Sequence, residues 1–378
     1  MSKPTASAWL GEATKAKAQH HEPLPEKRRM KLKTPPASTF FTAYGVRILQ
    51  ACGLPMQFWI LMELLQSVVP EKPDCDFVEY FCGNKAVTKG LLQRGLKGFG
   101  YDKKQDFHQE DLQSPLGFIV ALVWVLRVKI DEGLIWLGTV CSSWIWLSRG
   151  SCRRTRAKPR GGFFEGISVQ KGNILTAHSA VLMAIAYARG LIWVLEQPDS
   201  SLMKYHPAMK AVRRRLRRIG EPWWQIQTFM GAFDGPTTKG HELYSNSEII
   251  GSLRREHPGP NRDRSVQTAK KTCSKNGKVS VCGGKDLSDS QAYTPAFGHA
   301  VATAYIDLRH DERLVSDMMG YETGSESEGS DDNDDEIWDD CRFEDAIDVL
   351  KSWQIAADKE PSPKRKTSDI SRRRSARP

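Results

Sequence analysis

Cysteine pairs and long apolar runs are both missing from this sequence of 378 residues. Its eight cysteines form no CxxC pair and no Cys/His cluster with the spacing of zinc ligands, so we expect reduced thiols and no structural metal. No apolar run reaches the roughly 18 to 20 residues of a membrane span, and the first residues lack the apolar core of a secretory signal. We therefore expect a soluble, intracellular protein without a membrane partner.

The charge balance is basic. Lys and Arg number 55 against 45 Asp and Glu, which gives a formal net charge of +10. Such a balance favours polyanionic partners, nucleic acid above all, although solubility alone can also produce it. The clusters KRRMKLK and PKRK fit nuclear-import signals, the alternative being solvated charge, so we expect the protein in the nucleus.

Composition divides the chain into three parts. Residues 1–38 are rich in Lys, Pro, Ala and Ser, and we predict a disordered basic leader. Residues 39–310 contain the apolar segments, and one sizeable core fits a chain whose side chains are 40% hydrophobic. Residues 311–378 hold an acidic run followed by a basic Ser/Pro tail, which predicts disorder there too.

Strand-like and helix-like segments alternate within the central part. The segments DFVEYF, KGFGYD, GLIWLGTV and LIWVLEQP have the pattern of buried strands, and segments with apolar helical faces separate them. This alternation predicts an α/β fold, namely a Rossmann-like, doubly wound, mostly parallel sheet with helices on both faces. Ligands bind outside the carboxyl ends of such strands, so the residues that follow each strand are the candidates for a site.

The ends of the first two predicted strands carry a glycine and several carboxylates. Gly83 lies between a strand and a helix, where the backbone can approach a ligand closely, although ordinary packing also uses such a glycine. Glu79 could accept a hydrogen bond from an ammonium group. Asp102 follows at the spacing of a carboxylate that accepts from both ribose hydroxyls. Asp111 could reach an adenine edge or simply cap a helix.

A family resemblance appears at these residues. The stretch EYFCGNKAVTKGLLQRGLKGFGYD resembles the first two motifs of class I S-adenosylmethionine-dependent methyltransferases, in particular the cytosine carbon-5 DNA methyltransferases. Phe81, Cys82 and Gly83 match the first motif, whereas Lys85 and Ala86 stand where this family usually has glycines. The resemblance implies S-adenosylmethionine as the cofactor. The cofactor-binding residues that it implies are Glu79, Phe81, Gly83, Asp102 and Asp111.

Later motifs resemble the same family, in its divergent, phage-like branch, over about residues 74 to 308. The resemblance implies that Cys141 is the nucleophile, which adds as a thiolate to carbon 6 of cytosine. It also implies that Glu196 binds the base, best with a protonated carboxyl group, after the base has left its duplex. Thr139 and Val140 stand where the family has prolines that stiffen the loop. The alternative is that Cys141 is a small buried hydrophobe and Glu196 a solvated strand end.

Arginines are concentrated in two segments. One directly follows Cys141, where the cations, or the start of a helix, would increase the ionised fraction of the thiol and could also hold phosphates. The other is the predicted helix MKAVRRRLRR, which could present a cationic face to phosphate or simply carry solvated charge. The predicted nucleic-acid-binding residues are Arg149, Arg153, Arg154, Arg213, Arg214, Arg217 and Arg218. Residues 236–292 are predicted to form a short recognition or insert region.

Three functions follow from these patterns. The first is methyl transfer from S-adenosylmethionine to carbon 5 of a cytosine, with DNA as the favoured substrate and RNA as the alternative. The second is a catalytically silent relative that binds nucleic acid or chromatin partners through its arginines and tails. The third is methyl transfer to an exocyclic amino group, for which Cys141 would not be a nucleophile.

Overall fold

The computed structural model describes most of the central part of the chain. The predicted leader, residues 1–38, lies outside the described residues, and so does the predicted tail apart from the end of the last helix. Among the described helices, none is both long and apolar enough to cross a bilayer. The described residues are 40–130, 133–161, 166–259, 266, 268–273, 276–277, 279–284, 286–287 and 289–318.

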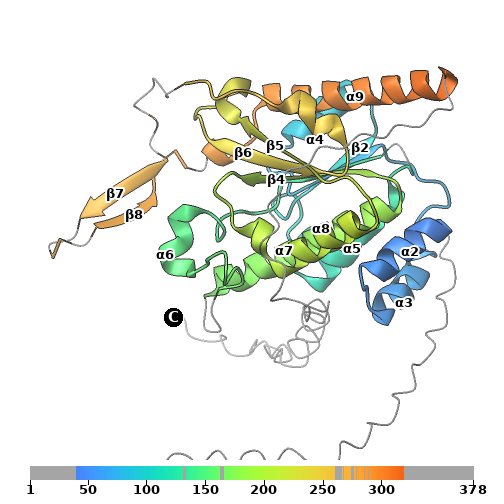
Figure 1. The fold of residues 1–378 in the computed structure, drawn as a ribbon, viewed down its shortest axis with the longest axis horizontal. Coiled ribbons are helices and arrows are strands. Elements are labelled where there is room, and N and C mark those ends of the chain that lie inside the picture. The colour runs from blue at the N-terminus through green and yellow to red at the C-terminus, as the bar shows by residue number, and fades with distance from the viewer. Residues whose placement is uncertain are drawn as a thin grey trace, which may run out of the picture. The chain divides into compact units, whose positions relative to one another are not determined.

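The described part of the chain forms an α/β fold (Figure 1). Its strands are β1 (Phe77–Tyr80), β2 (Gly98–Tyr101), β3 (Leu134–Leu137), β4 (Ile192–Pro198), β5 (Trp224–Phe229), β6 (Gly240–Ser245), β7 (Ala269–Cys273) and β8 (Val279–Gly283). Its α-helices are α2 (Ala43–Ala51), α3 (Met56–Leu65), α4 (Ala86–Gln93), α5 (Pro115–Arg127), α6 (Arg149–Cys152), α7 (Ile167–Ala188), α8 (Pro207–Arg218) and α9 (Pro295–Met318). Short 3-10 helices are η1 (Trp146–Ser148), η2 (Met203–Tyr205), η3 (Met230–Phe233), η4 (Glu248–Leu253) and η5 (Asp289–Gln291).

Local sequence signals set several helix ends. The Oγ of Ser114 accepts a hydrogen bond from the N–H of Gly117 at 2.9 Å and so caps α5. Helix α7 is followed by Gly190, whose φ of 71° lies in the left-handed region that glycine adopts without strain. Gly53 and Pro55 lie between α2 and α3, since glycine and proline both favour the end of a helix.

The main sheet has six strands in the order β2-β1-β3-β4-β6-β5. The first four strands in this order are parallel, and β6 pairs antiparallel with both β4 and β5. The predicted mostly parallel, doubly wound sheet is thus confirmed. The chain moves outward from β1 to β2 and then returns to the other side of β1 to form β3. This reversal makes the carboxyl ends of β1 and β3 the topological switch point, where ligands bind in open α/β sheets.

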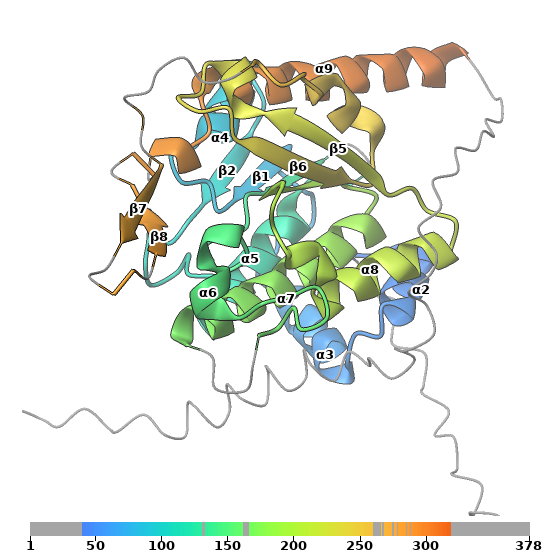
Figure 2. The ribbon, with the colours of Figure 1, turned by 60° about the vertical axis from the view of Figure 1, so that its left-hand side comes forward.

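Helices cover both faces of the sheet (Figures 1 and 2). On one face, α4 and α9 pack with alternate strand residues such as Phe77, Trp136 and Val194. On the other face, α5, α7 and α8 pack against the intervening strand residues, with α2 and α3 outside them. Because side chains alternate along a strand, Glu79 and Glu196 both lie on the face that α4 and α9 cover.

Helices α4 and α9 approach each other through two glycines. A Cβ atom on Gly90 would lie 2.4 Å from the carbonyl oxygen of Gly298, and one on Gly298 would lie 2.1 Å from that of Ala86. These distances are shorter than any van der Waals contact, so only glycine fits at either position. The close crossing fixes the start of α9 beside the loop that joins β1 to α4.

The hairpin of β7 and β8 forms a separate two-stranded sheet that projects from the main sheet (Figures 1 and 2). It falls within the predicted insert, residues 236–292. The start of that predicted insert is wrong, because β6 pairs with β4 and β5 inside the main sheet and η4 packs beside it. The described residues that project from the sheet begin after η4.

Candidate active site at the carboxyl ends of the strands

The loop that follows β1 has an unusual backbone. Phe81, Gly83 and Lys85 all have a positive φ, of 60°, 50° and 61°. This conformation is ordinary for glycine but strained for Phe81 and Lys85, and such strain is frequent at ligand sites. Lys85 stands where the resembled family has a glycine. It nevertheless adopts the left-handed conformation that favours glycine. Nothing lies within 4 Å of a Cβ built on Gly83, so the turn borders open space.

Gly83 and Asp102 lie together, as their spacing predicts. The N–H of Gly83 donates to Oδ2 of Asp102 at 3.0 Å, and Oδ1 of Asp102 accepts from the N–H of Lys104 at 2.8 Å. Asp111 lies near the start of α5, where its Oδ1 accepts from the N–H of Gln113 at 3.0 Å. These carboxylates stabilise the loops around the end of β2 and retain lone pairs for hydroxyl donors.

Glu110 is a further carboxylate at the end of β2, and the sequence reasoning missed it. Its Oε2 accepts from the N–H of Asp102 at 2.9 Å. Burial raises the pKa of Glu110. In the sequence, Glu110 directly precedes the candidate Asp111 in DFHQEDL, and this adjacency could have indicated it.

Glu79 lies beneath the loop rather than in open space. Its side chain is fully buried, and its Oε2 accepts from the N–H of Thr88 at 2.7 Å and from the Thr88 hydroxyl. Its Oε1 has no hydrogen-bond partner in the structure. Direct contact with a ligand ammonium is therefore blocked in this conformation, and the group stabilises the first turn of α4.

The burial of Glu79 predicts a specific pH dependence of stability. Burial raises the pKa of Glu79 from about 4.5 to about 7, so between these values the folded protein binds one proton more than the unfolded chain. The stability that Glu79 contributes is complete below pH 4.5 and is lost as the pH rises through 7. Relative to Glu79→Gln, we expect the wild type to lose about 3 kcal/mol of unfolding free energy over this interval, measured by urea denaturation.

The exposed Glu63→Gln supplies the control for this measurement, since it should follow the wild type at every pH. If Glu79→Gln and the wild type instead show parallel pH profiles, Glu79 is not held in the environment described here.

The loop after β3 is held in place by hydrogen bonds. The N–H of Gly138 donates to the carbonyl of Tyr80 at 3.1 Å, which ties the loop to the end of β1. Thr139 is buried, and its Oγ1 lies 2.8 Å from the hydroxyl of Ser179. The carbonyl of Thr139 accepts from Nε2 of Gln197 at 2.6 Å. These bonds stiffen the segment where the resembled family uses prolines, and they position Cys141 near the switch point.

The electrostatic environment of Cys141 differs from the predicted one. Cys141 is partly buried, and burial raises the pKa of its thiol. Glu196 raises this pKa further and Lys239 lowers it, and the net shift is upward. The prediction that neighbouring arginines or a helix start increase the thiolate fraction is therefore wrong. Helix α6 begins only at Arg149, and the cation within electrostatic reach is Lys239, from the segment before β6.

Glu196 lies at the carboxyl end of β4 in a buried polar cluster. Its Oε2 accepts from the hydroxyl of Tyr293 at 2.8 Å, and its Oε1 is hydrogen-bonded to Nδ1 of His241. Although burial alone would raise the pKa of Glu196, His241, Lys239 and Tyr293 together hold it below its ordinary value. Without a base these neighbours therefore favour the ionised carboxylate, whereas the protonated carboxyl group that the resemblance implies concerns the complex with a base.

Cys141 and Glu196 lie near each other, since the charge of Glu196 raises the pKa of Cys141 and the charge of Lys239 lowers the pKa of both groups. The sequence reasoning missed the groups that bind Glu196. His241 belongs to the antiparallel strand β6, and its buried Nε2 has no hydrogen-bond partner among the described residues. Tyr293 lies just before α9, where its carbonyl also accepts from Nδ2 of Asn84 at 2.7 Å. The motifs GHELYSN and YTPAF contained both residues, but no local pattern assigns their partners.

The predicted nucleic-acid-binding arginines differ in exposure. Five of them are exposed, namely Arg149, Arg153, Arg213, Arg217 and Arg218, and Arg214 is half-buried. Arg154 is only 2% exposed, which contradicts its predicted role. Its guanidinium donates to the side chains of Ser143 and Asn173 and to two backbone carbonyls, and it stacks 3.4 Å from the ring centre of Trp144.

In the described residues, no group of three or more His, Cys, Asp or Glu side chains could hold a metal ion. Comparison with known proteins finds no family model that matches this chain and no curated protein that resembles it significantly.

Proposed function

We propose that this protein transfers a methyl group from S-adenosylmethionine to carbon 5 of a cytosine in nucleic acid, in DNA before RNA. One observation carries the proposal. At the switch point of the sheet, the turn around Gly83 follows β1 and Cys141 follows β3, and Glu196, in the last residues of β4, lies near Cys141. A cofactor site and a nucleophile on adjacent strands are what methyl transfer to carbon requires.

The residues around the Gly83 turn suit this cofactor. Open space borders Gly83, and the carboxylates of Asp102 and Asp111 can accept hydrogen bonds from ribose hydroxyls or an adenine amine. Glu79 lies beneath the Gly83 turn and stabilises the first turn of α4 by accepting from the N–H of Thr88. When bound, S-adenosylmethionine supplies an electrophilic methyl-sulfonium group.

The chain's other residues act on the base. The Cys141 thiol gives its proton to solvent and its sulfur adds to carbon 6 of cytosine, which makes carbon 5 nucleophilic. Once carbon 5 carries the methyl group, it loses its own proton to solvent and the bond between sulfur and carbon 6 breaks, which restores the ring and the free thiolate. Lys239 stabilises the thiolate by its charge. The Glu196 cluster binds the ring. Each carboxylate oxygen accepts one bond, from Tyr293 or from His241, and keeps a lone pair that can accept from the base.

The same features favour a second candidate function, a catalytically silent protein that binds nucleic acid. The pKa of Cys141 is raised rather than lowered, and Glu196 has partners on both oxygens. A protein that has lost catalysis can keep its fold and its basic surface, while former catalytic side chains such as Cys141 and Glu196 only make contacts inside the protein.

Calorimetric titration with S-adenosylmethionine tests the proposal. We expect saturable binding, which Asp102→Ala weakens about 10- to 100-fold, because hydrogen bonds to a charged group are lost. The exposed Asp234→Asn is the control and should bind like the wild type. The absence of any titratable binding by the wild type would refute methyl transfer and leave the silent function.

A further inference from the structure

Three cations surround the ring of Tyr205 in η2. The Cζ of Arg156 lies 5.4 Å from the ring centre, and the Nζ atoms of Lys204 and Lys210 each lie 5.9 Å from it. Arg156 follows α6, whereas Lys210 belongs to α8, so the fold joins the two arginine-rich segments of the sequence into one surface. We name these four residues the Tyr205 platform.

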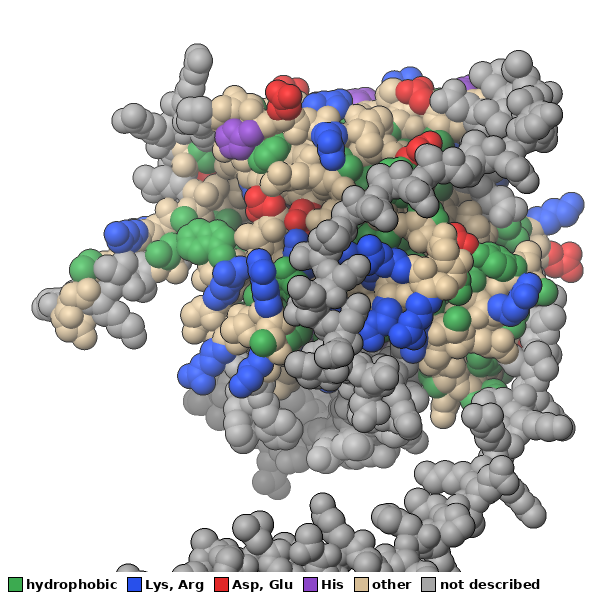
Figure 3. Space-filling model, in the orientation of Figure 1, with side chains coloured by type: hydrophobic (Ala, Val, Ile, Leu, Met, Phe, Trp, Pro, Cys, Tyr) green, Lys and Arg blue, Asp and Glu red, His purple; other side chains and the backbone are tan. Residues whose placement is uncertain are grey.

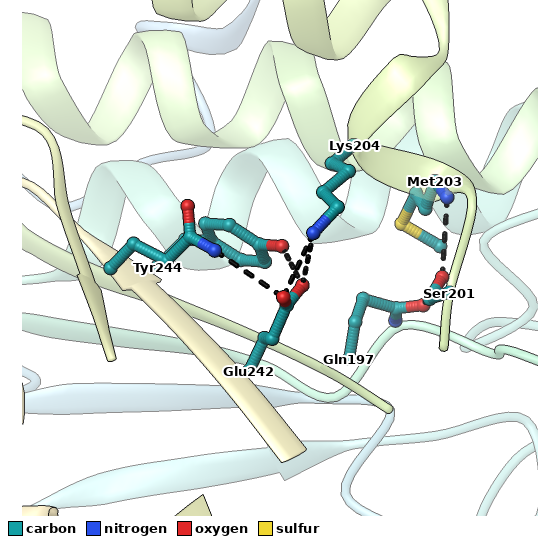
Figure 4. A network of polar contacts seen from close by, with 7 residues as sticks. Gln197, Ser201, Met203, Lys204, Glu242 and Tyr244 are labelled. Carbon is teal, nitrogen blue, oxygen red and sulfur yellow. Dashed lines mark hydrogen bonds and ion pairs between the residues drawn. The ribbon is translucent and has the colours of Figure 1, made fainter. Parts of the chain in front are cut away.

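Within the described part of the chain, only one of the three cations has a counter-ion. Lys204 Nζ lies 2.8 and 3.1 Å from the two carboxylate oxygens of Glu242, which neutralises it (Figure 4). Among the described residues, no carboxylate forms an ion pair with Arg156 or Lys210. Cations held near each other in this way repel, and an external anion that bridges them would relieve the repulsion.

The charge continues around the platform. Residues 142–161 contain six Lys and Arg and no Asp or Glu, and residues 200–220 contain seven and none. Figure 3 shows Lys and Arg side chains gathered on the face of the molecule where α6 and α8 lie. Along α8, Arg213 and Arg217 follow Lys210 at the three- and four-residue spacing of one helical side, which extends the surface into a track.

The Tyr205 platform is connected to the candidate active site. The hydroxyl of Ser201 donates to Oε1 of Gln197 at 2.9 Å and accepts from the N–H of Met203, the first residue of η2, at 3.2 Å (Figure 4). Gln197 in turn donates to the carbonyl of Thr139, two residues before Cys141. This chain of hydrogen bonds links η2, which carries Tyr205, to the loop that carries Cys141.

We infer that the Tyr205 platform binds the phosphodiester backbone of single-stranded nucleic acid, with Arg156 and Lys210 on phosphates and Tyr205 against a base. Guanidinium groups pair well with phosphates, and an aromatic ring among cations is the usual arrangement for unpaired strands, because every base has a face that can stack. This inference rests on the proposed function in one respect, that the substrate is a nucleic acid; it does not depend on catalysis.

The test measures binding of a fluorescent single-stranded oligonucleotide to the full chain by anisotropy, without cofactor, over a series of salt concentrations. Arg156→Glu/Lys210→Glu should weaken binding about tenfold or more and reduce the slope of log affinity against log salt by about 1.4, the value for two phosphate contacts. Tyr205→Ala should weaken binding about fivefold or more with little change in slope. Circular dichroism verifies that each variant is folded.

Lys72→Glu/Lys89→Glu is the matched control, because it changes the charge equally at two exposed lysines away from α6 and α8, one of them on α4 across the sheet. Equal weakening by the control and the platform variant would overturn the inference, as would displacement of the oligonucleotide by polyglutamate as readily as by unlabelled strand. Platform-dependent binding without any methyl transfer would leave the inference standing and refute the proposed function alone.

Discussion

Cys141→Ala is expected to reduce methyl transfer to cytosine by on the order of 10³-fold or more, with the affinity for S-adenosylmethionine nearly unchanged. In the proposed reaction the sulfur of Cys141 adds covalently to carbon 6, and without this addition carbon 5 stays unreactive. Radiolabelled methyl transfer to a cytosine-containing oligonucleotide measures the rate. The exposed thiol Cys273 provides the control, and Cys273→Ala should keep wild-type activity.

The wild-type rate should also rise with pH. Burial raises the pKa of Cys141 above its ordinary value, so the thiolate is a minor species at neutral pH and its fraction grows about tenfold per pH unit. A rate that is flat between neutral and mildly alkaline pH would show that deprotonation of Cys141 does not limit the reaction. Retained activity in Cys141→Ala would exclude the carbon-5 mechanism and favour transfer to an exocyclic amine.

Arg154→Ala is expected to lower the free energy of unfolding by about 3 to 5 kcal/mol, the range for removing one partner from a buried charged network. The guanidinium joins the segment after α6 to Trp144 and to the first half of α7, so its loss leaves buried acceptors without donors. Urea denaturation followed by tryptophan fluorescence gives the measurement.

Arg153→Ala, one residue away and exposed, should change the unfolding free energy by less than about 0.5 kcal/mol. If the two alanine variants are equally stable, Arg154 is not the structural residue described here, and its predicted contact with nucleic acid regains support.

The alternation of apolar segments was sufficient to predict the α/β class and the mostly parallel sheet. These features follow from short-range periodicity and from glycine and proline signals. The contact between Gly83 and Asp102 was predictable for the same reason, since two consecutive parallel strands bring the residues after them to one edge. The partners of Glu196 were not, because His241 and Tyr293 lie 45 and 97 residues further along the chain.

Arginine burial shows a second limit. Arg153 and Arg154 are adjacent and identical in type, yet one is exposed and the other buried over Trp144. Arg153 has a φ of 50°, so the backbone turns sharply there and sends the two side chains apart. The sequence alone does not distinguish the two arginines, and both were predicted to be surface cations. The upward pKa shift of Cys141 was equally hidden, since it depends on how closely the surrounding loops pack.

The most direct test of the proposed methyl transfer is covalent trapping. The full chain is incubated with S-adenosylmethionine and a single-stranded oligonucleotide that contains 5-fluorocytosine, whose fluorine blocks the release of the enzyme after methyl transfer. We predict a denaturant-resistant protein–oligonucleotide adduct that mass spectrometry maps to Cys141 and that Cys141→Ser abolishes. An adduct at another residue, or none under conditions where both cofactor and oligonucleotide bind, would contradict the account.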